Sequence, residues 1–126
     1  MSTVLVKAVK PYAPGDESAT VTLSSACGEI VVFCYPCHLK AGDQVENQLS
    51  ALDATVQAAY LSDWPEHVKE EKSRPRLERV GQYSYRGRGR VIDQAEGVVE
   101  VFGFHIHLGE VPCDGNVDFE CTRIDI

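Results

Sequence analysis

The sequence has no uninterrupted apolar run that approaches the roughly 20 residues of a membrane-spanning helix. Its first residues, MSTVLVKAVK, lack both the basic start and the long apolar stretch of a secretory signal. Motifs for a serine nucleophile elbow, a phosphate-binding loop and a dinucleotide-binding loop are also missing. These absences disfavour a membrane protein and the familiar enzyme classes, and we expect a cytoplasmic protein that is not an enzyme.

Disulfides are not needed to stabilise a chain of this length. Its 126 residues can bury roughly two-thirds of their unfolded surface in one core. The five cysteines are an odd number, and reduced thiols are the expectation for a cytoplasmic protein. With 44% hydrophobic and 25% charged residues, the composition is that of a folded globular protein. We therefore predict a single domain over residues 1–126.

Charge is distributed unevenly along the chain, whose net charge is −7. The segment from Lys69 to Arg90 holds eight basic and three acidic residues, so it carries +5 and the remainder carries −12. A strongly acidic body disfavours general nucleic-acid binding, because affinity for a phosphate backbone grows with the number of cations against it. A local basic strip is compatible with this distribution.

Turn signals divide the chain into short β-segments. Apolar patterns predict strands over residues 3–9, 19–23, 29–35, 80–92, 98–111 and 117–126, the last three forming a meander. Residues 45–60 fit both strand and helix, and we favour a strand near 45–51 followed by a short helix within 53–62. The polar stretch 61–77, interrupted by Pro65 and Pro75, is predicted to be a surface excursion.

Several short strands with one helical or irregular interruption near the middle predict a mainly β fold. We expect a small, closed or partly open barrel of five to seven strands. The segments LKAGDQV, GRVID, VVEVFGFHIHLGEVP and VDFECTRIDI together resemble the oligonucleotide/oligosaccharide-binding (OB) class of barrels. The resemblance spans most of the chain and implies a binding surface across the middle strands, not a reaction.

The segment YSYRGRGR, residues 83–90, interleaves aromatic residues with arginines. In a strand the arginines would share one face, while both tyrosines and both glycines share the other. The glycines would allow strong curvature or a bulge. Such an arginine row can contact phosphates or an acidic protein surface, but it can equally neutralise the protein's own acids. The predicted partner-binding residues are Tyr83, Tyr85, Arg86, Arg88 and Arg90.

The kind of partner follows from charge. An acidic body with one arginine strip suits a protein partner of mixed charge better than a polyanion. The alternative is single-stranded nucleic-acid binding, in which the arginines contact phosphates and aromatic side chains stack on bases. The candidates for stacking are Phe33, Trp64, Tyr83 and Tyr85.

The segment CYPCH, residues 34–38, matches the attachment motif of a c-type haem. A covalent haem usually takes a distal methionine or histidine ligand, and the only methionine is Met1. Cys34 continues the strand face of Ile30 and Val32, as a packed strand residue does. We therefore expect no haem and no other cofactor.

Zinc is the stronger metal alternative. Cys34 and Cys37 have the spacing of a zinc knuckle, and His105 and His107 lie on one strand face because they are two residues apart. The opposite face of that strand is apolar, which favours the histidines as its exposed or half-exposed side. The prediction is no metal, with Cys34, Cys37, His105 and His107 as the ligands if zinc binds.

Overall fold

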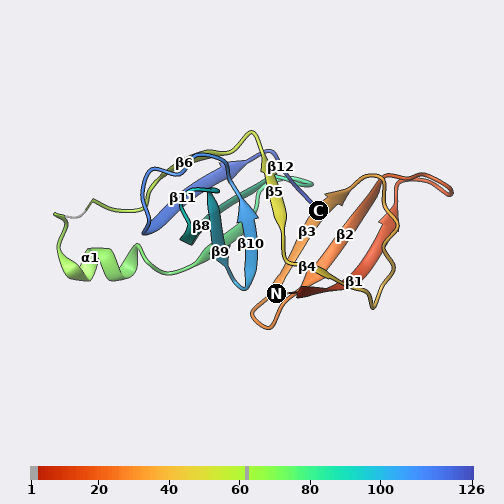
Figure 1. Cartoon of the computed structure of the whole chain (residues 1–126), viewed down its shortest axis with the longest axis horizontal. Coiled ribbons are helices and arrows are strands. Elements are labelled where there is room, and N and C mark those ends of the chain that lie inside the picture. Colours follow the sequence, from red (N-terminus) through yellow and green to blue (C-terminus); the bar gives the residue numbers. More distant parts are fainter. Residues whose placement is uncertain (1–2, 62) are drawn as a thin grey trace.

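The computed structural model describes residues 3–61 and 63–126 of the chain. Within these residues the fold is mainly β, as predicted, with twelve strands and one short helix (Figure 1). All the strands belong to one mixed sheet, whose path runs β4-β1-β2-β3-β12-β5-β10-β9-β8-β11-β6, while β7 pairs with β8 off this path. None of the described helices is long and apolar enough to cross a membrane.

The N-terminal part of the sheet is an antiparallel meander with one added edge strand. Strands β1 (Thr3–Pro11), β2 (Ala19–Ser24) and β3 (Glu29–Cys34) pair in order, and β4 (Gln44–Glu46) pairs with the free edge of β1. Side chains alternate between core and solvent along β2 and β3, which confirms the predicted strands there.

Two short strands connect this part to the rest of the sheet. Strand β12 (Arg123–Asp125) runs parallel to β3 and antiparallel to β5 (Leu49–Leu52), and β5 runs parallel to β10 (Phe104–His107). In Figure 1, β5 and β12 lie between the orange N-terminal strands and the blue C-terminal strands. The C-terminus therefore returns to the middle of the sheet and joins its two parts.

Strand β8 (Tyr85–Asp93) organises the C-terminal part. One of its edges pairs with β11 (Asn116–Cys121), and the other pairs first with β7 (Arg76–Arg79) and then with β9 (Val98–Val101). The outer edge of β11 pairs with β6 (Thr55–Ala58), which ends the path. Helix α1 (Glu66–Glu71) lies in the connection between β6 and β7.

The predicted helix within residues 53–62 is wrong for the residues that the structure describes. Residues 55–58 form edge strand β6, and the helix begins at Glu66, inside the stretch predicted to be a surface excursion. Residue 62 lies outside the described residues. The apolar residues of this segment fit both periods, and pairing with β11 decides in favour of strand.

The region predicted as one strand over residues 98–111 is a hairpin of β9 and β10. Phe102 and Gly103 form its two-residue turn, with φ values of 49° and 85°. This combination of positive φ values suits the twist of a tight hairpin. The segment 80–92 also begins later than predicted, because β8 starts at Tyr85.

The predicted barrel of five to seven strands is not confirmed, because the sheet has twelve strands and is not closed. The predicted C-terminal meander of segments 80–92, 98–111 and 117–126 is wrong in its order. Segment 98–111 lies beside β8 as the hairpin β9–β10, but β11 pairs with the other edge of β8 and not with β10. Local sequence patterns do not encode this order, because it depends on pairing between distant residues.

One hydrophobic core serves the whole sheet. It contains the inward side chains of both parts, with Leu23, Ile30, Phe104, Ile106 and Ile124 among the largest fully buried residues. Asn47 is the one polar side chain buried with them in the described chain; its amide donates to the Gly103 carbonyl and accepts from the His105 N–H. The inward side chains of both parts of the sheet therefore belong to one contiguous cluster.

Candidate functional site

Strand β8 separates the core from a surface that carries several charged side chains. Along Tyr85–Asp93 the residues alternate, with Tyr85 and both glycines buried and the three arginines on the outer side. The predicted division of YSYRGRGR into two faces is therefore confirmed for residues 85–90. The arginines share one outer surface with side chains from β7 and β11.

This surface, the charged face, consists of outward side chains on three adjacent strands: Arg76, Glu78, Arg86, Arg88, Arg90, Asp118 and Glu120. Register explains its composition, because Arg86 lies opposite both Glu78 and Glu120, and Arg88 lies opposite both Arg76 and Asp118. Four cations and three anions leave the charged face with a net charge of +1.

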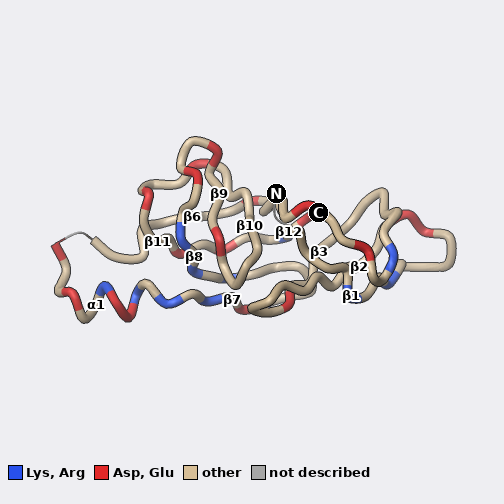
Figure 2. The backbone as a smooth tube through the Cα atoms, turned by 60° about the horizontal axis from the view of Figure 1, so that its bottom comes forward, with Lys and Arg blue, Asp and Glu red and all other residues tan. Residues whose placement is uncertain are grey.

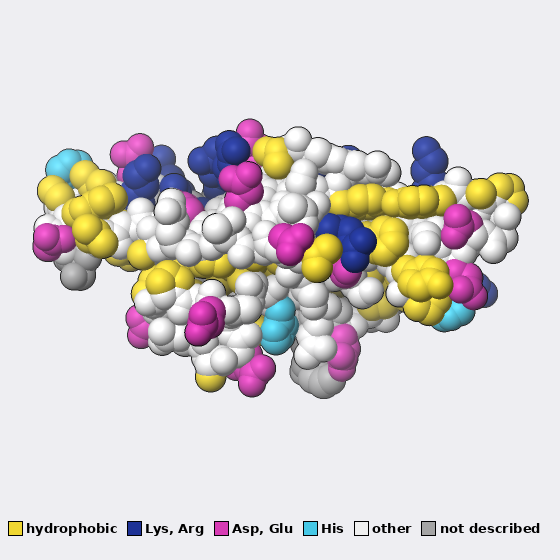
Figure 3. All heavy atoms as spheres, turned by 90° about the horizontal axis from the view of Figure 1, so that it is seen from above, with side chains coloured by type: hydrophobic (Ala, Val, Ile, Leu, Met, Phe, Trp, Pro, Cys, Tyr) yellow, Lys and Arg dark blue, Asp and Glu magenta, His cyan; other side chains and the backbone are white. Residues whose placement is uncertain are grey.

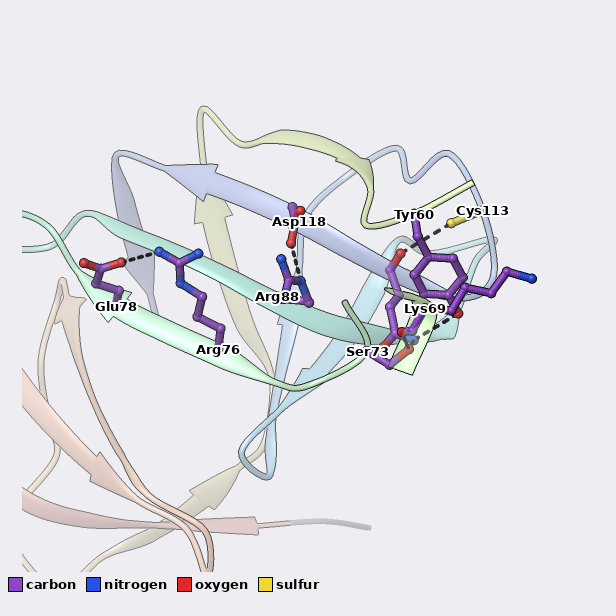
Figure 4. Close-up of polar contacts among 9 residues, drawn as sticks. Tyr60, Lys69, Ser73, Arg76, Glu78, Arg88, Cys113 and Asp118 are labelled. Atoms are coloured by element: carbon purple, nitrogen blue, oxygen red, sulfur yellow. Dashed lines mark hydrogen bonds and ion pairs between the residues drawn. The ribbon is translucent and has the colours of Figure 1, made fainter. Parts of the chain in front are cut away.

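Most of the cations on the charged face are paired with acids of the protein itself. The closest contact joins Arg88 Nε to Asp118 Oδ1 at 2.6 Å, and the Arg88 side chain is only 11% exposed (Figure 4). Arg76 pairs with Glu78 at 2.8 Å, and Arg86 Nε lies 3.5 Å from Glu120 Oε2. These arginines form a network of mixed charge and not a strip of free cations.

Arg90 differs from the other arginines of β8. It is exposed, and no side-chain ion pair is formed by it within the described part of the chain. Its cross-strand neighbours are Glu100 on β9 and Asn116 on β11. Because the Glu100 carboxylate accepts a hydrogen bond from the Gly103 N–H at 3.0 Å, it is directed to the β9–β10 turn. The guanidinium of Arg90 is therefore available to a partner.

A shallow cavity of about 420 Å³ lies on the charged face. Thr55 and Gln57 of β6 form one side of it and Arg76 of β7 the other, with Arg86 and Asp118 between them. Both cationic and anionic groups line the cavity. Its chemistry therefore suits a protein side chain or peptide that carries both charges and polar groups.

Helix α1 is attached to the sheet next to the charged face. The Asn116 side-chain amide donates to the Ser73 hydroxyl at 3.2 Å and lies 3.5 Å from the Tyr60 hydroxyl, and Ser73 in turn donates to the Lys69 carbonyl (Figure 4). These contacts join the end of the α1 region to β11, and Figure 2 shows lysines and arginines along the connection from α1 to β7, on one side of the molecule.

Tyr83 belongs to a second surface, over the N-terminal strands. Its ring centroid lies 5.6 Å from Phe33, and Phe33 lies 6.1 Å from Tyr12. We name these three residues the aromatic cluster. The Tyr83 hydroxyl hydrogen-bonds Thr20 at 2.6 Å and also the Tyr12 hydroxyl. Two of the predicted stacking residues, Phe33 and Tyr83, are therefore brought together, but Trp64 lies elsewhere, in the connection that precedes α1.

A cationic side chain of the protein itself, Arg123, packs against the aromatic cluster. The Arg123 guanidinium lies 4.4 Å from the Phe33 ring centroid and is held by Asp125 at 2.6 Å. This pairing with Asp125 raises the pKa of Arg123. Desolvation and the hydrogen bond with Tyr83 raise the pKa of Tyr12 to about 12, so the Tyr12 hydroxyl stays protonated at neutral pH.

Tyr85, a predicted partner-binding residue, lies in the core. It is 4% exposed, and its hydroxyl accepts a hydrogen bond from the Val31 N–H at 2.8 Å. Burial is the main cause of the raised pKa of Tyr85. The alternation of the strand that exposes the arginines is the physical reason that Tyr85 cannot share their surface.

The four residues of the zinc alternative are not brought together. Cys34 and Cys37 lie at the end of β3, whereas His105 and His107 lie on β10, and β12 and β5 separate these strands in the sheet. In residues 3–61 and 63–126, no three His, Cys, Asp or Glu side chains are grouped to hold a metal ion. The histidines are half-buried on the side of β10 opposite its core residues, as predicted.

The acids of the charged face and Arg123 are the site residues that the sequence interpretation missed. Asp118 and Glu120 alternate with buried residues in NVDFEC, a signal that places both on one strand face. Only the pairing of β11 with β8 brings them opposite the arginines.

Comparisons with protein-family models, curated proteins and solved structures find no match to this chain.

Proposed function

We propose that this protein is a non-enzymatic binding module that engages a protein partner through the charged face. The observation that carries the proposal is the arrangement of Arg76, Arg86 and Arg90 among acids on a continuous, exposed sheet surface with a shallow cavity. Interspersed charges of both signs give specificity and orientation to a protein interface, because each wrong partner brings like charges together.

The distribution of charge favours a protein over a polyanion. The charged face has a net charge of +1 and the chain a net charge of −7. The protein would therefore neutralise few phosphates of a nucleic-acid backbone. Figure 3 shows the same property in space, with basic and acidic side chains interspersed along one edge of the view.

Two charge-reversed double variants test the interface. Arg86→Glu/Arg90→Glu changes exposed residues of the charged face, and Lys10→Glu/Lys40→Glu changes exposed residues of the N-terminal part by the same total charge. Each variant and the wild type are immobilised and exposed to nuclease-treated lysate of the source cells. We expect a protein retained by the wild type and the lysine variant and lost from the arginine variant.

The retained protein is then purified and titrated against all three forms. A weakening of at least tenfold for the arginine variant alone supports the proposal. Equal affinity for all three forms, with the fold of each checked by circular dichroism, would exclude the charged face as the interface.

Single-stranded nucleic-acid binding is the second candidate, because Phe33 and Tyr83 lie together beside Arg123. Base stacking needs exposed ring faces, and cation contacts make such binding weaken with salt. Fluorescence anisotropy with an oligodeoxythymidylate, measured over a range of salt concentrations, separates the two functions. Salt-sensitive binding that Tyr83→Ala abolishes would favour the nucleic-acid function.

A further inference from the structure

Two thiols share one corner of the core at the end of β3. Cys34, the last residue of β3, is 5% exposed, and its thiol lies 3.9 Å from the Pro36 carbonyl. Cys37 is half-buried and packs against the same core. Its backbone N–H donates to the Glu17 carbonyl at 2.7 Å, which fixes it to the loop between β1 and β2.

The environments of the two thiols differ. Burial, followed by a hydrogen bond with the Cys37 side chain, raises the pKa of Cys34 to about 12, so that thiol stays protonated at neutral pH. Cys37 is the more accessible of the two. The other cysteines lie on separate segments: Cys27 in the β2–β3 turn, Cys113 before β11 and Cys121 at its end.

We propose that Cys34 and Cys37 form a reversible intramolecular disulfide when the protein meets a small disulfide oxidant such as oxidised glutathione. The geometry sets this pair apart: the Cys34 thiol reaches the Pro36 carbonyl at 3.9 Å, and Cys37, the next residue, packs against the same core. Disulfides of cytoplasmic proteins are usually transient, catalytic or redox-sensing. The modification is independent of the charged face and goes beyond the proposed binding function.

The reaction proceeds by two thiol–disulfide exchanges. The Cys37 thiolate attacks one sulfur of oxidised glutathione, forming a mixed disulfide and releasing one glutathione thiolate, which takes a proton from solvent. The Cys34 thiol then gives its proton to solvent, and the thiolate attacks the Cys37 sulfur of the mixed disulfide; the second glutathione leaves as a thiolate and takes a proton from solvent. Overall, two protein thiols lose two electrons and two protons, and one oxidised glutathione becomes two reduced glutathiones.

The buried position of Cys34 favours the disulfide in one respect. Some dithiol proteins are strong oxidants because their reduced form is stabilised, commonly through a thiolate of low pKa. Cys34 gains no such stabilisation, since burial disfavours its thiolate. The dithiol form of this pair therefore gains no stability from a thiolate that would oppose formation of the disulfide.

Counting free thiols after oxidation tests the proposal. The exposed Cys27 can take up glutathione by itself, so the experiment uses Cys27→Ser, which leaves four of the five cysteines. The reduced protein is incubated with oxidised glutathione, denatured in acid, alkylated and weighed by mass spectrometry. We expect a species with two alkylated thiols and no glutathione adduct, which dithiothreitol returns to four.

Removal of either partner distinguishes this pair from other cysteines. Adding Cys37→Ser changes only a half-buried thiol, so this variant should fold even if Cys34→Ser does not. This variant should give no oxidised species that lacks a glutathione adduct. The variant with Cys113→Ser added instead should still form the disulfide. Four alkylated thiols after oxidation, an adduct on each reactive cysteine, or closure that survives Cys37→Ser would each overturn the proposal.

Discussion

The two faces of strand β8 differ in how tightly their residues are constrained. On the core face, Gly87 and Gly89 lie so close to neighbouring strands that a side chain has no room. On the charged face, Arg86 and Arg90 are exposed, and their contacts can be exchanged for contacts with a partner. One strand therefore combines positions that specify the fold with positions that are free to specify binding.

The largest expected effect is on the core face, at Gly87. A Cβ atom there would lie 2.6 Å from the Phe119 ring and 2.7 Å from the Arg76 carbonyl oxygen of β7. We expect Gly87→Ala to lower the free energy of unfolding by about 3 kcal/mol, because overpacking against backbone forces the strands apart. Urea denaturation monitored by circular dichroism measures the change.

Gly28→Ala is the matched control. Its Cβ would meet only the Cβ of Phe102 at 3.7 Å, an ordinary contact, and we expect a change within about 0.5 kcal/mol. Similar stabilities for the Gly87 and Gly28 variants would show that β7 is not packed against β8 in this way.

The next effect concerns the Tyr85 hydroxyl. Tyr85→Phe keeps the ring but leaves the Val31 N–H without its partner at 2.8 Å, and an unsatisfied donor in this half-buried position costs about 1–2 kcal/mol. Tyr35→Phe changes a residue that is 62% exposed and should leave stability unchanged. Equal melting curves for the two variants would contradict a core role for the Tyr85 hydroxyl.

The alternation of residues predicted the two faces of β8, but not that Tyr85 is buried in the core or what the glycines do. Alternation in YSYRGRGR correctly separated Arg86 and Arg88 from Tyr85. Tyr85 was nevertheless assigned to the binding surface, because an aromatic next to arginines resembles a stacking site. The two glycines predict strong curvature or a bulge. The register shift lies at residues 91–93, and the glycines make room for Phe119 and for neighbouring backbone.

Long-range pairing set the limit of prediction. Strands β2 and β3 were predicted because their alternation and the turn between them are local signals. The contacts of Arg88 with Asp118 and of Phe33 with Tyr83 join residues 30 and 50 positions apart, and no local period encodes them. The same reason explains β6, whose strand conformation depends on pairing with β11, more than 50 residues later.

Two of the ion pairs on the charged face differ in burial. Arg88 and Asp118 are 11% and 31% exposed, whereas Arg86 and Glu120 are 50% and 58% exposed. Double-mutant cycles with Arg88→Met/Asp118→Asn and Arg86→Met/Glu120→Gln should give coupling energies of about 1 kcal/mol and less than about 0.5 kcal/mol. Equal couplings would show that Arg88 is as free for a partner as Arg86.

The smallest effect is electrostatic and concerns Glu78. The hydrogen bond from Arg76, together with its positive charge, lowers the pKa of this exposed carboxyl, and Arg86 adds a weaker contribution. A carboxyl whose folded pKa is lowered stabilises the fold above its unfolded pKa, and the contribution is lost as the pH falls through the folded pKa. Titration of the side-chain carboxyl carbons by NMR should show the pKa of Glu78 rising clearly in Arg76→Gln and only slightly in Arg86→Gln. The opposite order would mean that Arg86 reaches across to β7 in solution, and Arg86 would then be tied to the acids of the protein and less available to a partner than Arg90.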